Sequence, residues 1–143
     1  MKLKRFKNLI FLNIARYVPM PSRKVRPFFV HLGGVYVADY KTNFIGSGVI
    51  FDTNHPENIT LERGSRITNG CVILSHYFNV KTRKHNIGNV IIGEGAFIGC
   101  NTVICKPVKV GKLAVIGASS VVTKDIPDNQ VWAGNPAKFI KQI

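Results

Sequence analysis

The chain has 143 residues, the length of one domain, and carries a formal net charge of +13 at pH 7. That charge indicates an anionic partner, which composition alone leaves open as nucleic acid, acidic lipid or a polyphosphorylated small molecule. The three cysteines exclude a disulfide framework, and no Cys/His set has the spacing of a zinc site, so a cytoplasmic protein without a bound metal is expected.

The first expected element is an amphipathic helix over residues 1–17. Apolar residues recur there at steps of three and four, and lysines and arginines cover the other faces. The apolar run is too short to span a bilayer, and Asn13 and Arg16 interrupt it, which also disfavours a secretory signal. Two interpretations stay open: the helix caps one end of the fold, or it rests peripherally on anionic lipid at the inner membrane surface.

The chain divides into three segments of a single domain. Residues 1–34 hold the helix and a basic lead-in, which follows the two prolines that end the helix. Residues 35–132 carry short strands on a six-residue period. Residues 133–143 follow the end of the repeat and are expected to form a tail or a short helix.

The six-residue period defines the fold class. An aliphatic residue opens each hexad, Gly usually follows, and a small or aliphatic residue fills the fifth position. The openers of the most regular stretch are Ile92, Ile98, Ile104, Val110, Ile116 and Val122. A hexapeptide period is the sequence mark of a parallel β-helix, so an all-β fold is expected, and an ordinary β-sandwich is the disfavoured alternative.

Three hexads to a coil would stack side chains that lie eighteen residues apart, such as Ile98 on Ile116, into an inward aliphatic column. The fourth position of a hexad suits a corner with positive φ, for which Gly and then Asn are favoured. Leu113 and Pro107 occupy that position and do not suit a positive φ. The corners are therefore not expected to share one geometry.

The hexad pattern fails over residues 75–91, which we interpret as a polar loop projecting from one corner of the coil. A shorter excursion at His55-Pro56 interrupts the pattern earlier. Loops that a rigid solenoid positions often carry function.

These motifs resemble those of the hexapeptide-repeat acyltransferases. The likeness covers residues 45–143 and is most specific in FIGCNTVI, IGASSVVTKDIP and AGNPAKFI. Within that family, the chain is most similar to O-acetyltransferases that modify sugars of surface polysaccharides. The resemblance implies a left-handed parallel β-helix, a homotrimer with active sites between subunits, acetyl-CoA as co-substrate and no metal.

The resemblance also implies that His76, at the start of the loop, is the catalytic base. The chemistry agrees, because a sugar hydroxyl must lose its proton as it attacks a thioester and a positioned imidazole can accept that proton. The backbone N–H of Cys100 would stabilise the developing oxyanion. The competing histidines are His31, His55 and His85; the His55-Pro56 pair precedes two more complete hexads, which is the wrong place for the base.

Binding residues follow from the same resemblance. Phe97 would border the thioester, and Cys100 and Ala118 would lie along the pantetheine arm. The expected acetyl-CoA-binding residues are Phe97, Gly99, Cys100, Gly117, Ala118, Thr123, Lys124, Lys138 and Lys141. The expected acceptor-binding residues are Tyr77, Lys84 and His85, while no acidic residue or Asn that would orient the acceptor is recognised in the sequence.

Other functions remain open. One is N-acetylation of an amino sugar or O-acetylation of serine, although serine acetyltransferases usually carry a larger N-terminal helical domain. Another is a non-catalytic β-helix that acts as a scaffold. Nucleic-acid binding is not expected, because the sequence contains no helix-turn-helix, zinc or RNA-reading motif.

Overall fold

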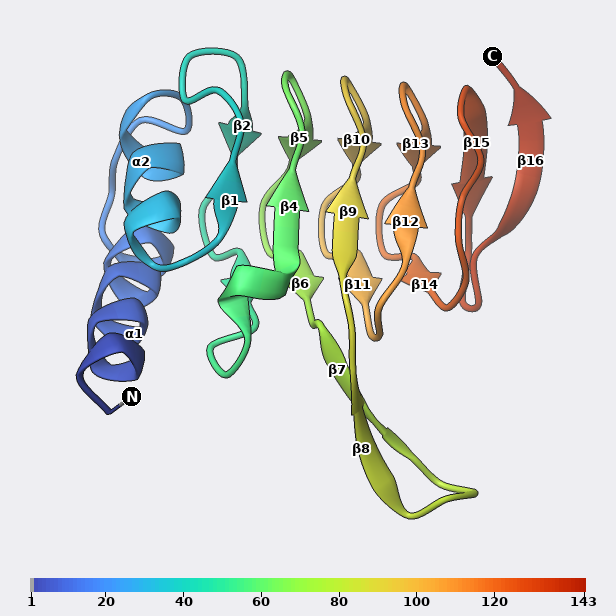
Figure 1. The fold of residues 1–143 in the computed structure, drawn as a ribbon. Coiled ribbons are helices and arrows are strands. Elements are labelled where there is room, and N and C mark those ends of the chain that lie inside the picture. Colours follow the sequence, from blue (N-terminus) through green and yellow to red (C-terminus); the bar gives the residue numbers. More distant parts are fainter. Residues whose placement is uncertain (1) are drawn as a thin grey trace.

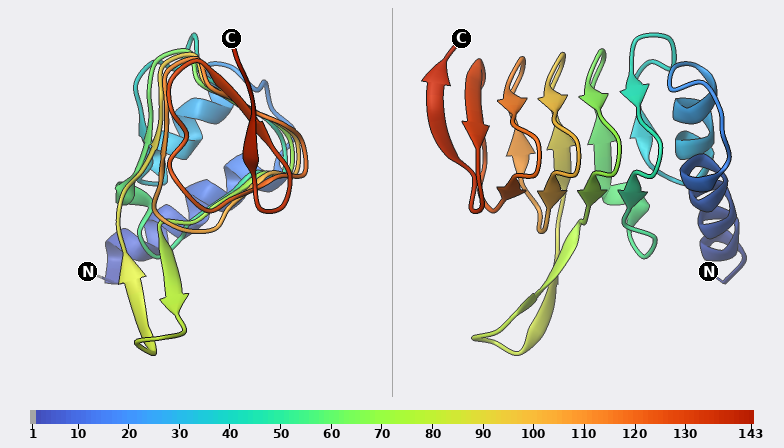
Figure 2. Two further views of the ribbon diagram at one scale, coloured as in Figure 1. Left: turned by 90° about the vertical axis from the view of Figure 1, so that its right-hand side faces the viewer. Right: turned by 180° about the vertical axis from the view of Figure 1, so that it is seen from behind.

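The computed structural model describes residues 2–143. Two helices, α1 (Lys2–Tyr17) and α2 (Val25–Leu32), precede a coil of short strands. The strands of the coil form three sheets that make the faces of a three-sided prism, and within these three sheets all neighbours are parallel except at the last strand (Figures 1 and 2). Helix α1 therefore agrees with the expected helix, apart from Met1, which lies outside the described residues.

Each turn of the chain contributes one strand to each sheet in succession. The first sheet contains β1 (Tyr36–Val37), β4 (Ile59–Leu61), β9 (Val90–Ile92) and β12 (Lys109–Val110). The second contains β2 (Phe44–Ile45), β5 (Arg66–Ile67), β10 (Phe97–Ile98), β13 (Val115–Ile116), β15 (Gln130–Ala133) and β16 (Lys138–Gln142). The third contains β3 (Ile50–Phe51), β6 (Val72–Ile73), β11 (Val103–Ile104) and β14 (Val121–Val122).

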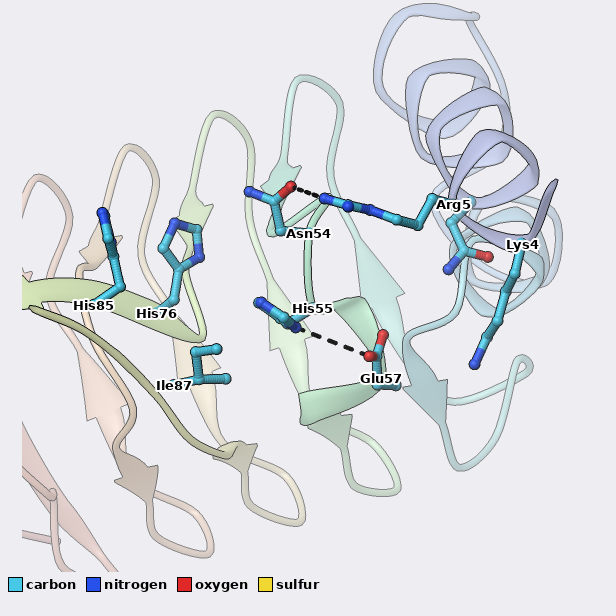
Figure 3. A pocket seen from close by; sticks show the side chains of 9 residues that line it. Lys4, Arg5, Asn54, His55, Glu57, His76, His85 and Ile87 are labelled. Carbon is cyan, nitrogen blue, oxygen red and sulfur yellow. Dashed lines mark hydrogen bonds and ion pairs between the residues drawn. The ribbon is translucent and has the colours of Figure 1, made fainter. Parts of the chain in front are cut away.

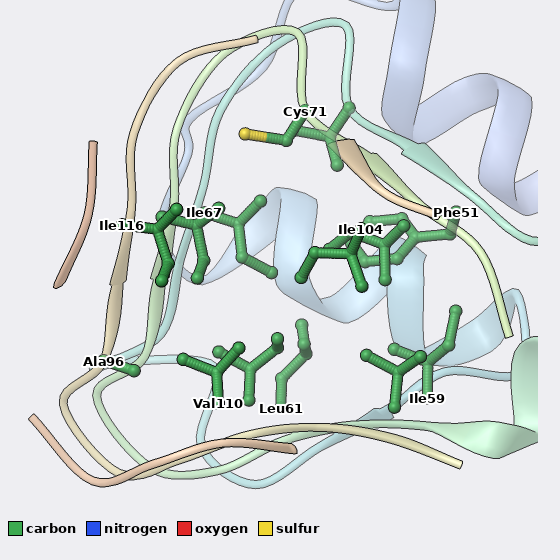
Figure 4. Close-up of a cluster of buried hydrophobic side chains, with 14 of the residues drawn as sticks. Phe51, Ile59, Leu61, Ile67, Cys71, Ala96, Ile104, Val110 and Ile116 are labelled. Atoms are coloured by element: carbon green, nitrogen blue, oxygen red, sulfur yellow. The ribbon is translucent and has the colours of Figure 1, made fainter. Parts of the chain in front are cut away.

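The aliphatic column inside the prism follows the predicted register. Ile98 pairs with Ile116 across β10 and β13, and both side chains are fully buried. Ile104 pairs with Val122 in the same way on the third sheet. Cys71 fills a small inward position, as expected, and its burial raises the pKa of the thiol. Figure 4 shows Ile104, Ile116 and Cys71 among the side chains that point into the coil.

This column makes a direct prediction for stability. Replacing Ile98 by Ala should lower the free energy of unfolding by about 2–5 kcal/mol, because the coils above and below cannot close the cavity that the change leaves. Val103→Ala, on an outward and partly exposed position, is the matched control and should cost clearly less. Urea unfolding of the two variants measures the difference, and equal losses would contradict the stacked column.

The corners differ between the three edges of the prism. Corners at the second edge, between the second and third sheets, have positive φ, and so do those at the first edge, between the first and second sheets, from the β4–β5 corner onward. Leu113 has a φ of 56°, so the expectation that it would avoid this conformation was wrong. Its N–H bonds to the carbonyl of Glu94 on the previous coil at 2.8 Å, and this shared corner geometry outweighs the cost for a side chain with a Cβ. Pro107 lies at the third edge, between the third and first sheets, where no positive φ is required.

The N-terminal end of the prism is covered by helices. The basic segment that follows α1 contains a second helix, α2, which was not predicted from the sequence. Helix α2 buries Val30 against the coil. Helix α1 packs beside it and buries Asn8, Leu12 and Ala15. Arg26 of α2 joins the two helices, because its guanidinium donates to the carbonyl of Ala15 at 2.9 Å. Helix α1 thus caps the coil.

The C-terminal end is a β-hairpin, so the expected tail or short helix over residues 133–143 was wrong. Strand β16 runs antiparallel to β15 and extends the second sheet by one strand. Gly134, with a φ of 106°, allows the chain to reverse between them.

The interrupted segments both project from the third edge. The first contains the short 3₁₀ helix η1 (Pro56–Asn58). The second, predicted as loop 75–91, is an antiparallel hairpin of β7 (His76–Asn79) and β8 (Lys84–Ile87), and its last residues already belong to β9 (Figure 1). Among residues 2–143, the helices are too short or too polar to cross a bilayer.

Candidate active site

A cavity of about 530 Å³ lies where the two projecting segments of the third edge meet α1. Its walls come from three elements that are far apart in the sequence (Figure 3). The lining residues are Lys4, Arg5 and Asn8 of α1, Asn54, His55 and Glu57 of the first segment, and His76, His85 and Ile87 of the hairpin. Of the residues expected to act in catalysis, His76 is on this wall.

The imidazole of His76 is held by a buried carboxylate. Its Nδ1 lies 2.5 Å from Oδ2 of Asp52, whose side chain is almost completely buried at the end of β3. Ser75 donates to the same carboxylate oxygen from its amide at 3.0 Å and from its hydroxyl at 2.8 Å. The amide of Asn54 donates to the other oxygen at 2.9 Å. The carboxylate therefore has a fixed position, and it fixes the ring of His76.

This network also sets the charge of Asp52. Burial by itself raises the pKa of Asp52, but the hydrogen bonds from His76, Ser75 and the Asn54 amide outweigh burial and hold the pKa below the ordinary value of an aspartate. Asp52 is therefore ionised at neutral pH, and its Oδ2 can accept a hydrogen bond from the N–H of Nδ1 of His76. The tautomer with its proton on Nδ1 leaves Nε2 as an unprotonated base, which is the arrangement that a carboxylate fixes for a catalytic histidine in a Ser-His-Asp triad.

Sequence reasoning missed Asp52. One signal was available, because Asp52 stands at the second position of a hexad, where Gly is usual, directly after the inward Phe51. Its coil also lies next to the coil that leads into His76, since Ile50 pairs with Val72 and Phe51 with Ile73.

The competing histidines have different surroundings. His55 and His85 flank His76, with ring centroids 6.1 and 6.2 Å away, and both line the cavity. His55 was set aside because of its place in the repeat, yet the structure brings it to the same wall as His76. His31 lies on α2 against Tyr40, away from the cavity. Only His76 among these four has a hydrogen bond to a carboxylate in the described chain.

The three expected acceptor-binding residues do not lie together. His85 lines the cavity and packs against Phe78, with ring centroids 5.3 Å apart. The hydroxyl of Tyr77 accepts a hydrogen bond from Asn86 at 3.0 Å, and its ring lies beside the ammonium of Lys106. Lys84 is exposed near the far end of the hairpin. Neither Tyr77 nor Lys84 lines the cavity.

The expected acetyl-CoA-binding residues lie on two edges and one face of the prism. Cys100 and Ala118 are exposed on neighbouring coils at the second edge, where Ser119 donates its amide to the carbonyl of Cys100 at 2.8 Å. Gly99 allows these coils to approach, because a Cβ there would lie 2.5 Å from the amide nitrogen of Ala118. Gly117 also lies close to the following coil, because a Cβ added to it would lie 2.8 Å from the Cβ of Ala133.

The remaining expected residues lie on the second sheet or at the third edge. Phe97 of β10 is 37% exposed on the second sheet. Thr123 and Lys124 follow β14 at the third edge, and the ammonium of Lys124 lies 5.0 Å from the centre of the Trp132 ring. Lys138 and Lys141 are exposed on β16.

One chain does not bring its own His76 to its own Cys100. His76 follows the third sheet at the third edge, whereas Cys100 follows the second sheet at the second edge. The Cys100 amide makes no hydrogen bond within residues 2–143, so it remains available as a donor. A site that used both groups would need the second edge of a neighbouring chain.

A metal site was not expected from the sequence. Within residues 2–143 the structure contains no cluster of three or more His, Cys, Asp and Glu side chains that could hold a metal ion.

Comparisons with known proteins agree with this architecture. The family model described as "Bacterial transferase hexapeptide (six repeats)" matches residues 89–124. The chain is 35% identical over 141 residues to the Bacillus subtilis (strain 168) protein named "Putative acetyltransferase YvoF", covering 96% of this chain and 77% of that protein. The chain therefore belongs to the hexapeptide-repeat acetyltransferases and is an acyltransferase.

Two solved structures share the fold. A galactoside acetyltransferase in complex with coenzyme A superposes with a TM-score of 0.70 at 23% identity, covering 99% of this chain and 82% of that one. A maltose O-acetyltransferase from Clostridium difficile 630 superposes with a TM-score of 0.65 at 21% identity, covering 99% and 87%. At this level of identity the likeness concerns the fold.

Proposed function

We propose that this acetyltransferase transfers an acetyl group from acetyl-CoA to a hydroxyl of a sugar in a surface polysaccharide or its precursor. The observation that carries the proposal is His76 on the wall of the cavity with Nδ1 bound to the buried, ionised Asp52. That arrangement holds the ring through Nδ1 and leaves Nε2 free to act as a general base.

The reaction follows from this geometry by direct attack. Nε2 of His76 accepts the proton of the acceptor hydroxyl while the hydroxyl oxygen bonds to the thioester carbonyl carbon. The charge that develops on the carbonyl oxygen is stabilised by the backbone N–H of Cys100. Nε2 then returns the proton to the departing sulfur as the carbon–sulfur bond breaks, and Asp52 keeps the ring oriented throughout.

Because His76 and Cys100 lie at different edges of the prism, the active site forms between two chains. A homotrimer of left-handed coils around a threefold axis would place the third edge of each chain beside the second edge of its neighbour.

The residues present fit a coenzyme A thioester between such chains. Phe97, Cys100 and Ala118 form an exposed strip for the pantetheine arm, and Gly99 and Gly117 keep the coils beneath it close. The exposed cations for the phosphates are Lys124, Lys138 and Lys141, with Thr123 beside them. The structure of the galactoside acetyltransferase that contains coenzyme A supports this choice of co-substrate.

N-acetylation of an amino sugar is the second candidate, since the same base would serve an amine. Serine O-acetylation is less favoured, because the cavity of about 530 Å³ is large for an amino acid. A non-catalytic scaffold is disfavoured by the Asp52–His76 pair, which a purely structural coil does not need.

One assay separates these functions. Thiol release from acetyl-CoA is measured with a panel of sugars, amino sugars and serine, and the product is identified by mass spectrometry. The proposal expects release with a hydroxyl sugar and a sugar ester as product. Acetyl transfer to amines alone would favour the second candidate, and no release with any acceptor would support a scaffold.

Peripheral contact with an anionic membrane is a separate proposal for the outer face of α1, at the cytoplasmic side of the inner membrane. Leu3 and Phe6 are 81% and 61% exposed there, and Lys7 lies on the same helix. An apolar stripe flanked by lysines is typical of helices that lie on acidic lipid.

The membrane proposal predicts a measurable loss. The double variant Leu3→Ser and Phe6→Ser should bind phosphatidylglycerol vesicles more than tenfold less tightly than the unaltered chain, because two apolar side chains no longer enter the lipid. Cosedimentation at low and high salt measures it. Equal binding of the two proteins, or equal binding to neutral phosphatidylcholine vesicles, would contradict the proposal.

A further inference from the structure

The cavity beside His76 has a second wall with a different chemical character. Helix α1 contributes Lys4, Arg5 and Asn8 to it, and Figure 3 shows Arg5 extending toward the segment that carries Asn54 and His55. A molecule that fills the cavity therefore contacts the base on one side and the cationic turns of α1 on the other.

The charges on this wall are not balanced by the protein. Among residues 2–143, neither Lys4 nor Arg5 forms an ion pair. In the described part of the chain, Glu57 is the only acidic residue that lines the cavity, and its carboxylate lies 4.0 Å from the imidazole of His55. Asp52 lies beneath the wall and is already occupied by His76 and Ser75.

Arg5 is held in place by a neutral partner. Its Nη2 donates to Oδ1 of Asn54 at 2.8 Å, which links α1 to the first projecting segment. The guanidinium has five N–H donors, so the bond to Asn54 leaves others free for a carboxylate or a phosphate. Planar guanidinium groups bind these anions with paired hydrogen bonds, and a positioned one loses little freedom on binding.

We propose that the acceptor sugar carries an anionic group, a carboxylate or a phosphate, which binds Arg5 and Lys4 while its hydroxyl faces His76. This inference rests on the proposed function, because it names the class of acceptor for the same site. It gives α1 a second role: the helix that caps the coil also selects the substrate. A neutral sugar of the same size leaves both cations unpaired in the cavity.

Arg5 can be tested without disturbing the fold. Its bond to Asn54 is at the surface, and exposed substitutions of this kind usually change stability little. Lys7 offers a matched control, because Lys7→Gln removes the same charge from the same helix at a position that does not line the cavity.

The experiment measures the binding of paired probes to the full chain by titration calorimetry. Galactose is compared with galacturonate, and glucose with glucose 6-phosphate, so that the two pairs separate a carboxylate from a phosphate. We expect one anionic member to bind at least about tenfold more tightly than its neutral partner. Arg5→Gln should remove that advantage, Lys4→Gln should reduce it, and Lys7→Gln should leave it unchanged.

Thiol release from acetyl-CoA with the same probes separates the inference from the function on which it rests. Three binding results would overturn the inference, with or without thiol release. They are equal binding of charged and neutral sugars, no binding of any probe, and equal losses of affinity in Arg5→Gln and Lys7→Gln. If an anionic sugar binds tightly through Arg5 but is not acetylated, the result supports the anion site. The same result refutes the proposed reaction.

Discussion

Replacing His76 by Ala should lower kcat/KM for sugar acetylation by about 10²- to 10⁴-fold, because the acceptor hydroxyl loses the base that takes its proton. The side chain is 27% exposed on a hairpin outside the coil, so the prism should remain folded. Thiol release at saturating acetyl-CoA gives the rate, and circular dichroism with gel filtration checks the fold and the assembly.

The control for this variant is His85→Ala. His85 lines the same cavity with its ring 6.2 Å from His76, but it lacks a carboxylate partner. It should alter KM for the acceptor more than kcat, since it can contact substrate without moving the proton. Turnover retained in His76→Ala, or lost equally in both variants, would show that the base has been misassigned.

The second large effect is expected for Asp52, which acts through His76 as a positioning residue. Asp52→Asn preserves the shape of the side chain but lets its amide donate to Nδ1, which favours the tautomer with the proton on Nε2. The change should lower kcat by up to about 10⁴-fold with KM nearly unchanged, because Nε2 can no longer accept a proton. Nitrogen-15 NMR of His76 reports the tautomer directly, and a purely structural role for Asp52 would leave it unaltered.

The same variant tests the ionisation of Asp52. The pKa of Asp52 is lower in the folded chain than in the unfolded one, where an aspartate has a pKa of about 3.9. The stability that the ionised carboxylate contributes is therefore fully present above that value and is lost as the pH falls through the lower folded pKa. The difference in unfolding free energy between the unaltered chain and Asp52→Asn should shrink below about pH 4. A constant difference down to pH 3 would contradict this assignment.

The sequence predicted the coil because its packing repeats. Each inward position, such as Ile98, meets the same kind of neighbour one coil away, so a short pattern determines register over the whole body. The ends were predicted less well. Helix α2 and strand β16 have no repeating neighbour, and their structure depends on packing against a single coil or strand.

The repeat led to His76 as the predicted base but not to its carboxylate partner Asp52, for one physical reason. The rule of eighteen residues per coil holds between β9 and β14, but Ile50 pairs with Val72 across a gap of 22 residues in the earlier coils. The projecting segments change the length of those coils, and they are also the segments that carry the site. Regular spacing therefore stops being informative at the position where Asp52 and His76 meet.

The hexad repeat could not predict the cavity either. It forms only because α1 folds back over the coil end and places Arg5 beside Asn54, a contact between residues 49 positions apart. The proposed pairing of His76 with the Cys100 amide of a neighbour would depend on an assembly that a single chain does not contain.

A crystal structure of the full chain with bound coenzyme A would locate the reacting thiol. We expect the thiol to lie between two chains, beside Nε2 of His76 from one and the Cys100 amide from the other, with the pantetheine arm passing Ala118. A thiol bound away from His76, or a coenzyme held within a single chain far from the third edge, would contradict this expectation.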